Sequence, residues 1–211
     1  MIEKELKYQL TFGDFEKFKE YVYQSASIKE NFNQTNFYIE TNQYHLSEND
    51  ISLRIRKKDN QTFEFTIKLK NIALENNLSI KKEFNKLIDH DLANDILQNK
   101  VSISETEIGQ WLNQYLNVKN SSIEYSIIGN LKTFREVCKI TDFLDPIILD
   151  KSSYLSIEDY EVEWETEDIT QARYWIENSF DVLQIQPIDN MDSKRKRFLK
   201  RLTQLKALNS K

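Results

Sequence analysis

The sequence predicts an α+β protein in which antiparallel strands close into a barrel with a charged interior, flanked by helices. Several short segments alternate charged and apolar residues, as strands with one polar and one apolar face do. Segments with apolar residues at helical spacing lie between groups of these strands. The 211 residues include only 3 Gly and 2 Pro, which favours long regular elements with few special turns.

The expected strands carry their charges in rows on one face. The first strand places Glu3, Glu5 and Lys7 in one row, and a later strand places Arg54 and Arg56 in another. The opposite faces of these strands hold mainly aliphatic and aromatic residues. We expect strands at 2–10, 32–40, 51–56, 63–70, 78–87, 123–140, 146–154 and 160–165.

The expected helices have apolar residues at a spacing of three or four. Asp14 is placed to cap the first helix, and Ser104 with Glu107 has the spacing of a capping box. We expect helices at 14–24, 89–98, 104–116, 168–180 and 193–207, with the segment 41–50 as a connector.

Length and composition indicate one domain over residues 1–211, including the basic helix at 193–207, because 39% hydrophobic residues can form a full core. The single cysteine, Cys138, excludes an internal disulfide and a cysteine-based zinc site. We expect a cytoplasmic monomer or homodimer without a membrane segment. The net charge of −5 argues against nucleic acid as a partner.

The charged rows combine residues that suit phosphates with residues that suit a hard cation. Arg and Lys bind phosphate oxygens, and carboxylates bind Mg²⁺ or Mn²⁺. A solvated sheet face is the alternative interpretation of each row taken alone. The rows contain Glu3, Glu5, Lys7, Arg54, Arg56, Lys68, Lys70, Lys81, Glu83, Arg135, Asp150, Glu161, Glu163 and Glu165.

These residues resemble a known family in the order in which they occur. The segment Glu3-x-Glu5-x-Lys7 resembles the ExExK signature of the CYTH superfamily, the triphosphate tunnel metalloenzymes. The resemblance spans nearly the whole chain, and the stretch from 149–154 through 159–163 is especially similar to small stand-alone bacterial members. The further matches are Arg54-x-Arg56, Lys68, Lys81-x-Glu83, Arg135, Asp150, Glu161-x-Glu163 and Lys194.

The resemblance implies an eight-stranded antiparallel barrel that forms a triphosphate tunnel. It also implies hydrolysis of a small triphosphate, most simply inorganic triphosphate, with Mg²⁺ or Mn²⁺ as cofactor and Lys7 and Tyr38 as the catalytic residues. The implied metal ligands are Glu3, Glu5, Glu83, Asp150, Glu161 and Glu163. The implied substrate ligands are Lys7, Arg54, Arg56, Lys68, Lys70, Lys81, Arg135 and Lys194.

Two positions depart from the family pattern, since Asn85 replaces an acidic residue and Thr133 replaces a basic one. Other functions therefore stay open: adenylate cyclase or thiamine triphosphatase of the same superfamily, or a non-catalytic module that binds polyphosphate or a nucleotide. In the basic run of the last helix we expect Lys194 to point into the tunnel and the other basic residues to be solvated.

Overall fold

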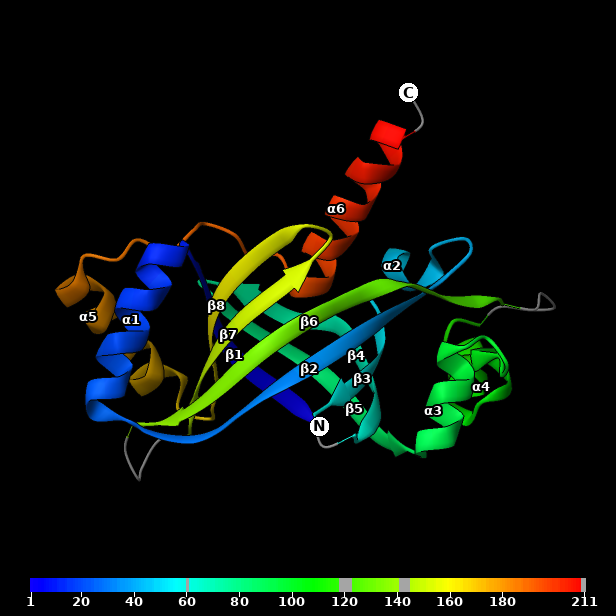
Figure 1. Ribbon diagram of the computed structural model, residues 1–211, viewed down its shortest axis with the longest axis horizontal. Coiled ribbons are helices and arrows are strands. Elements are labelled where there is room, and N and C mark those ends of the chain that lie inside the picture. Colours follow the sequence, from blue (N-terminus) through cyan, green and yellow to red (C-terminus); the bar gives the residue numbers. More distant parts are fainter. Residues whose placement is uncertain (60, 118–122, 141–144, 210–211) are drawn as a thin grey trace. The chain divides into compact units, whose positions relative to one another are not determined.

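The computed structural model describes residues 1–59, 61–117, 123–140 and 145–209. These residues form eight strands, six α-helices and one 3₁₀ helix (Figure 1). The strands are β1 (Ile2–Leu10), β2 (Ser27–Thr41), β3 (Ser52–Lys58), β4 (Phe63–Glu75), β5 (Leu78–Ile88), β6 (Tyr125–Lys139), β7 (Ile147–Tyr154) and β8 (Ile157–Glu165). The helices are α1 (Phe12–Ser25), α2 (His45–Glu48), α3 (His90–Leu97), η1 (Ile103–Glu105), α4 (Glu107–Tyr115), α5 (Ile169–Leu183) and α6 (Lys194–Asn209).

The strands close into a barrel in the order β1-β5-β4-β3-β2-β6-β7-β8, which confirms the predicted fold class. The registers that join β1 to β5 and β8, β3 to β4, and β7 to β6 and β8 are all antiparallel. Among the described residues, none of the helices combines the length and the hydrophobicity of a membrane-spanning segment.

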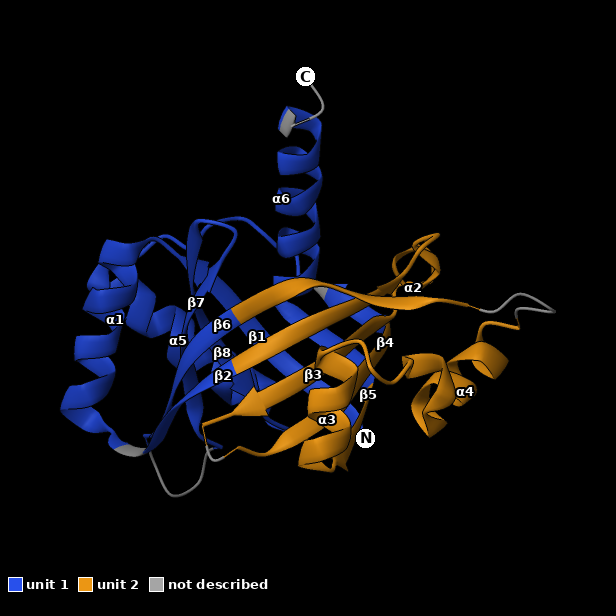
Figure 2. Ribbon diagram, turned by 45° about the vertical axis from the view of Figure 1, so that its right-hand side comes forward, with its two compact units in different colours: residues 1–34, 71–82, 132–211 blue, residues 35–70, 83–131 orange. Residues whose placement is uncertain are grey.

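The chain divides into two compact units, coloured in Figure 2. Unit 1 consists of residues 1–34, 71–82 and 132–211, and unit 2 consists of residues 35–70 and 83–131. The strands β2, β4, β5 and β6 contribute residues to both units. Each unit has its own hydrophobic core.

The core of unit 1 lies between two helices and the apolar face of the strands. The helices α1 and α5 lie side by side against β1 and β8 (Figure 1). Trp164 of β8 is fully buried, and its ring meets Trp175 of α5 edge to face at 5.6 Å between centroids. Leu6, Tyr8 and Phe18 join the same core. The side of the barrel strands that alternates with the charged rows is therefore covered by helices.

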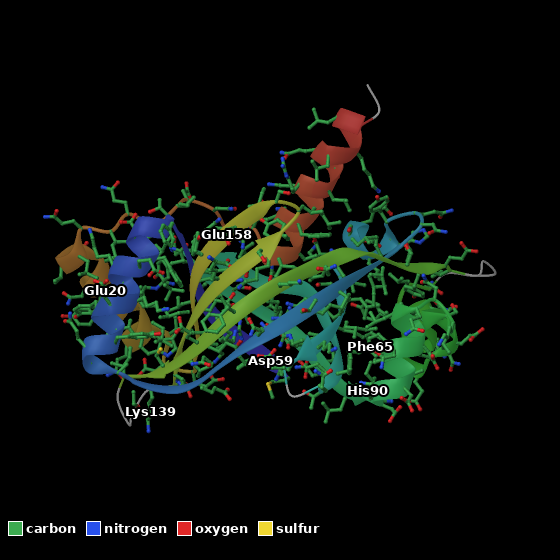
Figure 3. All side chains as sticks on the ribbon, viewed as in Figure 1. Glu20, Asp59, Phe65, His90, Lys139 and Glu158 are labelled. Atoms are coloured by element: carbon green, nitrogen blue, oxygen red, sulfur yellow. The ribbon has the colours of Figure 1, made fainter. Side chains whose placement is uncertain are left out.

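The core of unit 2 is built in the same way from β3, β4, α3 and α4. Ile55 and Phe65 from the strands pack with Ile96 and Leu112 from the helices, and all four are buried. Figure 3 labels Phe65 and His90 where β4 and the start of α3 come together. Apolar residues at alternate strand positions thus predict correctly which strand faces lie under helices.

The sequence analysis did not predict α2, which lies within the expected connector 41–50. This single turn is held by the carboxylate of Glu40, which is fully buried and accepts hydrogen bonds from the backbone N–H groups of Leu46 and Ser47 at 3.0 Å each. The turn depends on a side chain outside it, so neither periodicity nor a capping pattern reveals it.

Two expected helix caps are wrong. Thr11, rather than Asp14, caps α1, and its hydroxyl accepts from the N–H of Asp14 at 3.2 Å. Thr106, rather than Ser104, caps α4, because Ser104 belongs to η1. The Thr106 hydroxyl accepts from the N–H of Gly109 at 3.1 Å and so satisfies a free N–H group in the first turn of α4.

A glycine of α4 gives a test of the packing in unit 2. A Cβ at Gly109 would lie 2.0 Å from the carbonyl oxygen of Ile103, whereas a Cβ at Gly13 in α1 would meet nothing within 4 Å. We expect Gly109→Ala to lower the free energy of unfolding by about 1–3 kcal/mol, because backbone atoms must shift. We expect Gly13→Ala to leave it unchanged or raise it by up to about 1 kcal/mol. Urea denaturation followed by tryptophan fluorescence measures both variants, and equal stabilities would contradict this packing.

Candidate functional site

The polar face of unit 1 brings charged residues from four strands together. Across β1 and β8, Lys7 lies opposite Glu163, and across β7 and β8, Asp150 lies opposite Glu161. Across β6 and β7, Arg135 lies opposite Asp150. The alternation read from the sequence therefore places these side chains on one face, as expected.

Arg135 makes the most extensive contacts with these carboxylates. Its Nε and Nη2 donate to the two oxygens of Asp150 at 2.8 and 2.6 Å, and Nη2 also donates to Glu163 at 2.8 Å. Burial opposes the charge of Arg135, but the neighbouring carboxylates of Asp150 and Glu163 raise its pKa overall. This two-pronged geometry holds the guanidinium in a fixed orientation.

Lys7 lies between two carboxylates. Its Nζ is 3.2 Å from Glu163 and 3.5 Å from Glu5. Burial alone would lower the pKa of Lys7, but the charges of Glu5, Glu163 and Glu161 raise it well above its ordinary value. Lys7 is therefore a stable cation at neutral pH.

Lys194, the first residue of α6, reaches into the same group. Its Nζ lies 2.9 Å from Asp150, 2.7 Å from Glu161 and 2.5 Å from Glu163. Burial opposes its charge, but these three carboxylates raise the pKa of Lys194. Within unit 1, Lys194 thus points toward carboxylates of the strands, and its place in a tunnel stays a prediction.

The expectation that the other basic residues of this helix are solvated is wrong for Arg195 and Arg197, which are 9% and 7% exposed. Arg197 donates from Nε to Asp159 at 2.7 Å, and its Nη2 lies 3.0 Å from Glu161. Residues three apart lie on one face of a helix, so the spacing of Lys194 and Arg197 could have identified Arg197.

We call this group the unit 1 charge cluster. Among the described residues it contains four cations and five carboxylates, and each cation lies within 4 Å of a carboxylate. Its members are Lys7, Arg135, Lys194, Arg197, Glu5, Asp150, Asp159, Glu161 and Glu163.

Glu161 is the most enclosed member of the unit 1 charge cluster. It is fully buried, and neither of its carboxylate oxygens accepts a hydrogen bond within the described residues. Burial would raise its pKa, but Lys194, Lys7 and Arg197 lower it to about 2. Glu161 is therefore an anion that is held by ion pairs, with Lys194 at 2.7 Å and Arg197 at 3.0 Å.

Carboxylates of this kind are the donors that Mg²⁺ and Mn²⁺ prefer, so the residue types of the cluster fit the implied metal. In the part of the chain that the structure describes, no open group of three or more acidic, histidine or cysteine side chains stands ready for a metal ion. The ammonium of Lys194 lies among Asp150, Glu161 and Glu163 instead.

Three further predicted residues lie beside the cluster in the strand register. Glu3 is opposite Lys81, and both are 8% exposed. Glu165 is opposite Glu5, so it shares the face of Glu161 and Glu163. The acidic row of β8 thus continues to the end of the strand.

Unit 2 contains a second charged group on β3, β4 and β5. Lys68 lies 2.7 Å from Glu83. Burial would raise the pKa of Glu83, but Lys68 and Arg54 lower it to about 2. Arg54 is opposite Thr66, and the Arg54 Nε and the Thr66 hydroxyl are buried without a hydrogen-bond partner in the described residues.

The remaining predicted residues of unit 2 differ in burial. Arg56 donates to Asn36 at 3.0 Å and lies 3.3 Å from Glu64. Tyr38 is 1% exposed and shares a strand face with Asn36. Lys70 is exposed, two residues beyond Lys68, and its contact with a ligand stays a prediction.

The two departures from the family pattern have structural partners. Asn85 occupies the position of the second acidic residue in the family pattern. Its side-chain amide donates to Glu83 at 2.8 Å and so orients that carboxylate. The Thr133 hydroxyl lies 3.0 Å from that of Ser152, and both residues are buried. A neutral hydroxyl pair thus replaces a cation beside Arg135.

The cluster makes a stability prediction for α6. We expect Arg197→Met to lower the free energy of unfolding by about 3–5 kcal/mol, because Asp159 and Glu161 lose a buried partner. We expect Lys200→Met, on the same helix with a side chain that is 61% exposed, to change it by less than about 0.5 kcal/mol. Chemical denaturation compares them, and a mild effect at Arg197 would show that the cluster does not need this cation.

The chain is similar to several known proteins along most of its length. A model of the family described as "CYTH domain" matches residues 1–197. The proposed triphosphatase YjbK of Bacillus subtilis (strain 168) is 29% identical over 172 residues, which cover 82% of this chain and 81% of that protein.

Solved structures show the same architecture. The proposed adenylyl cyclase HpAC1 from Hippeastrum, described as having a dominant triphosphatase activity, superimposes with a TM-score of 0.81 at 20% identity, over 94% of this chain and 95% of its own. At that identity the likeness concerns the fold. A proposed adenylate cyclase from Bacillus halodurans gives a TM-score of 0.71 at 26% identity, over 92% and 95% of the two chains.

Proposed function

Since this chain belongs to the CYTH family, we propose that it is an enzyme that hydrolyses a small triphosphate, with inorganic triphosphate as its substrate, in the presence of Mg²⁺ or Mn²⁺. The observation that carries this proposal is the unit 1 charge cluster, in which buried carboxylates pair with cations that are buried or partly buried. Such a cluster suits a triphosphate that binds as a complex with a divalent metal ion.

The basic residues are proposed to bind the phosphates. Arg135 presents a fixed guanidinium, and Lys7 and Lys194 present ammonium groups, which suit phosphate oxygens. In unit 2 we assign the same role to Arg54, because its buried Nε lacks a partner among the described residues. Arg56, Lys68, Lys70 and Lys81 are assigned to phosphate binding by the family resemblance.

The charge balance supports dependence on a divalent metal. The five carboxylates of the unit 1 charge cluster outnumber its four cations, so a triphosphate entering alone would meet an excess of negative charge. When bound, Mg²⁺ or Mn²⁺ would offset this charge and polarise the phosphate oxygens. The proposed ligands are Glu3, Glu5, Glu83, Asp150, Glu161 and Glu163.

The chain's own residues would stabilise the charge that develops as the terminal phosphate leaves. Lys7 stays protonated because of its carboxylate neighbours, so it acts as a hydrogen-bond donor and a positive charge rather than as a base. Arg135 would add a second fixed donor. Tyr38 is proposed to orient the attacking water through its hydroxyl.

A matched pair of lysines on β1 tests the activity. With tripolyphosphate and Mg²⁺ or Mn²⁺ we expect release of orthophosphate, and we expect Lys7→Ala to lower kcat/KM about a hundredfold, because one transition-state contact is lost. Lys4 lies on the opposite face of the same strand and pairs with exposed Glu167, so Lys4→Ala should retain the activity of the unsubstituted protein.

The products distinguish the functions of the superfamily. ATP, thiamine triphosphate and tripolyphosphate are compared under the same conditions. Cyclic AMP and pyrophosphate from ATP, without orthophosphate, would identify a cyclase, the activity in the description of the Bacillus halodurans structure. Binding of triphosphate without any product would identify a binding module instead.

Removal of divalent metal is a second test of the proposal. We expect excess EDTA to abolish release of orthophosphate and added Mg²⁺ or Mn²⁺ to restore it, because the carboxylates then repel an uncompensated triphosphate. Activity that persists in EDTA after dialysis would contradict the proposed metal ligands.

A further inference from the structure

The position of Lys194 resembles that of a bound cation. Its ammonium lies 2.5–2.9 Å from one oxygen of each of three carboxylates, those of Asp150, Glu161 and Glu163. Its ammonium donates hydrogen bonds to Asp150 and Glu163, and it forms an ion pair with Glu161. Asp150 and Glu161 are fully buried, and Lys194 therefore provides charge neutralisation that solvent cannot provide.

The side chain of Lys194 can leave this position without unfolding α6. The rest of the helix has its own anchors in unit 1: Phe198 is fully buried and packs on Tyr154 at 6.0 Å between ring centroids, and Arg197 binds Asp159. Lys194 is the first helical residue, and the segment before it is not helical. Four methylene groups make its ammonium mobile relative to its backbone.

Lys194 is a cation at the N-terminus of α6, where a positive charge destabilises a helix. The first turn of α6 contains no acidic residue, and positive side chains interact unfavourably with the positive end of a helix dipole. The carboxylates of the strands therefore hold the lysine in place, and the helix does not. A competing cation would release it.

We propose that Lys194 is a tethered cation that occupies the place of a divalent metal among Asp150, Glu161 and Glu163, and that metal must displace it. The inference rests on the proposed metal-dependent function. It adds that the Lys194 ammonium competes with the metal ion for the same three carboxylates. A metal ion that binds alone must displace the Lys194 ammonium from its carboxylates. When triphosphate binds together with the metal ion, the displaced ammonium can bind a phosphate group instead. Metal and triphosphate therefore bind cooperatively.

Binding of Mn²⁺ without triphosphate tests this inference directly. Isothermal titration calorimetry compares the unsubstituted protein with Lys194→Met and with Lys196→Met, a lysine on the same helix whose side chain is 64% exposed. We expect Lys194→Met to bind Mn²⁺ about tenfold more tightly or better and Lys196→Met to match the unsubstituted protein. In the presence of Mn²⁺, Lys194→Met should bind tripolyphosphate more weakly, because it loses a phosphate ligand.

A measurement on the unsubstituted protein covers the case in which Lys194→Met does not fold. The ammonium resonance of Lys194, followed by ¹H–¹⁵N NMR, should shift or disappear on titration with Mg²⁺, while that of Lys196 should not. A Lys194 resonance that is unchanged at saturating Mg²⁺ would overturn the inference.

The outcomes separate the inference from the proposed function. Hydrolysis that needs metal, combined with Mn²⁺ binding that Lys194→Met leaves unchanged or weakens, would overturn the inference alone. Failure of every form of the protein to bind Mn²⁺ or to hydrolyse tripolyphosphate would overturn both.

Discussion

Charges of both signs, buried or partly buried on one face of the strands, are the constraint from which the rest of unit 1 follows. An isolated buried ion costs several kcal/mol, so each of these side chains needs a partner of opposite sign at close range. The antiparallel register supplies the partners, as with Lys7 opposite Glu163 and Arg135 opposite Asp150. Helix α6 supplies the remaining cations from outside the strands. A polar interior of this kind is poorly suited to hydrophobic stabilisation, which must come from elsewhere.

The opposite faces of the same strands provide that stabilisation. Trp164 and Phe65 belong to separate cores, each formed between strands and helices within one unit. The usual arrangement of a soluble sheet is thus inverted, with charge on one face and helices over the apolar face. This separation lets the charged face vary in chemistry without a change in the cores, which fits a family whose members are described both as triphosphatases and as cyclases.

Period-two alternation made most of the fold and much of the candidate site predictable from the sequence. The rows that contain Glu3, Glu5 and Lys7 could be read directly, because parity alone decides the face of a strand residue. Features that depend on contacts distant in sequence could not be read. The turn α2 depends on buried Glu40, and the pairing of Arg197 with Glu161 depends on where α6 docks. The placement of Lys194 among three carboxylates could not be predicted either. The periodicity of the sequence predicts which face of a strand or helix a residue occupies, but it does not predict distances between residues.

Lys194 and Arg197 lie near the end of the chain, so they are synthesised after the strands whose carboxylates they pair with. Every strand that carries the carboxylates of the unit 1 charge cluster precedes α6 in the chain, so a ribosome completes those strands before it adds the two cations. Without α6, Lys7 and Arg135 are the two described cations of the cluster that remain to balance its five carboxylates. The nascent strands therefore carry uncompensated negative charge, which opposes their close approach. We therefore expect the strands of unit 1 to close fully only after residues 194–197 have been synthesised.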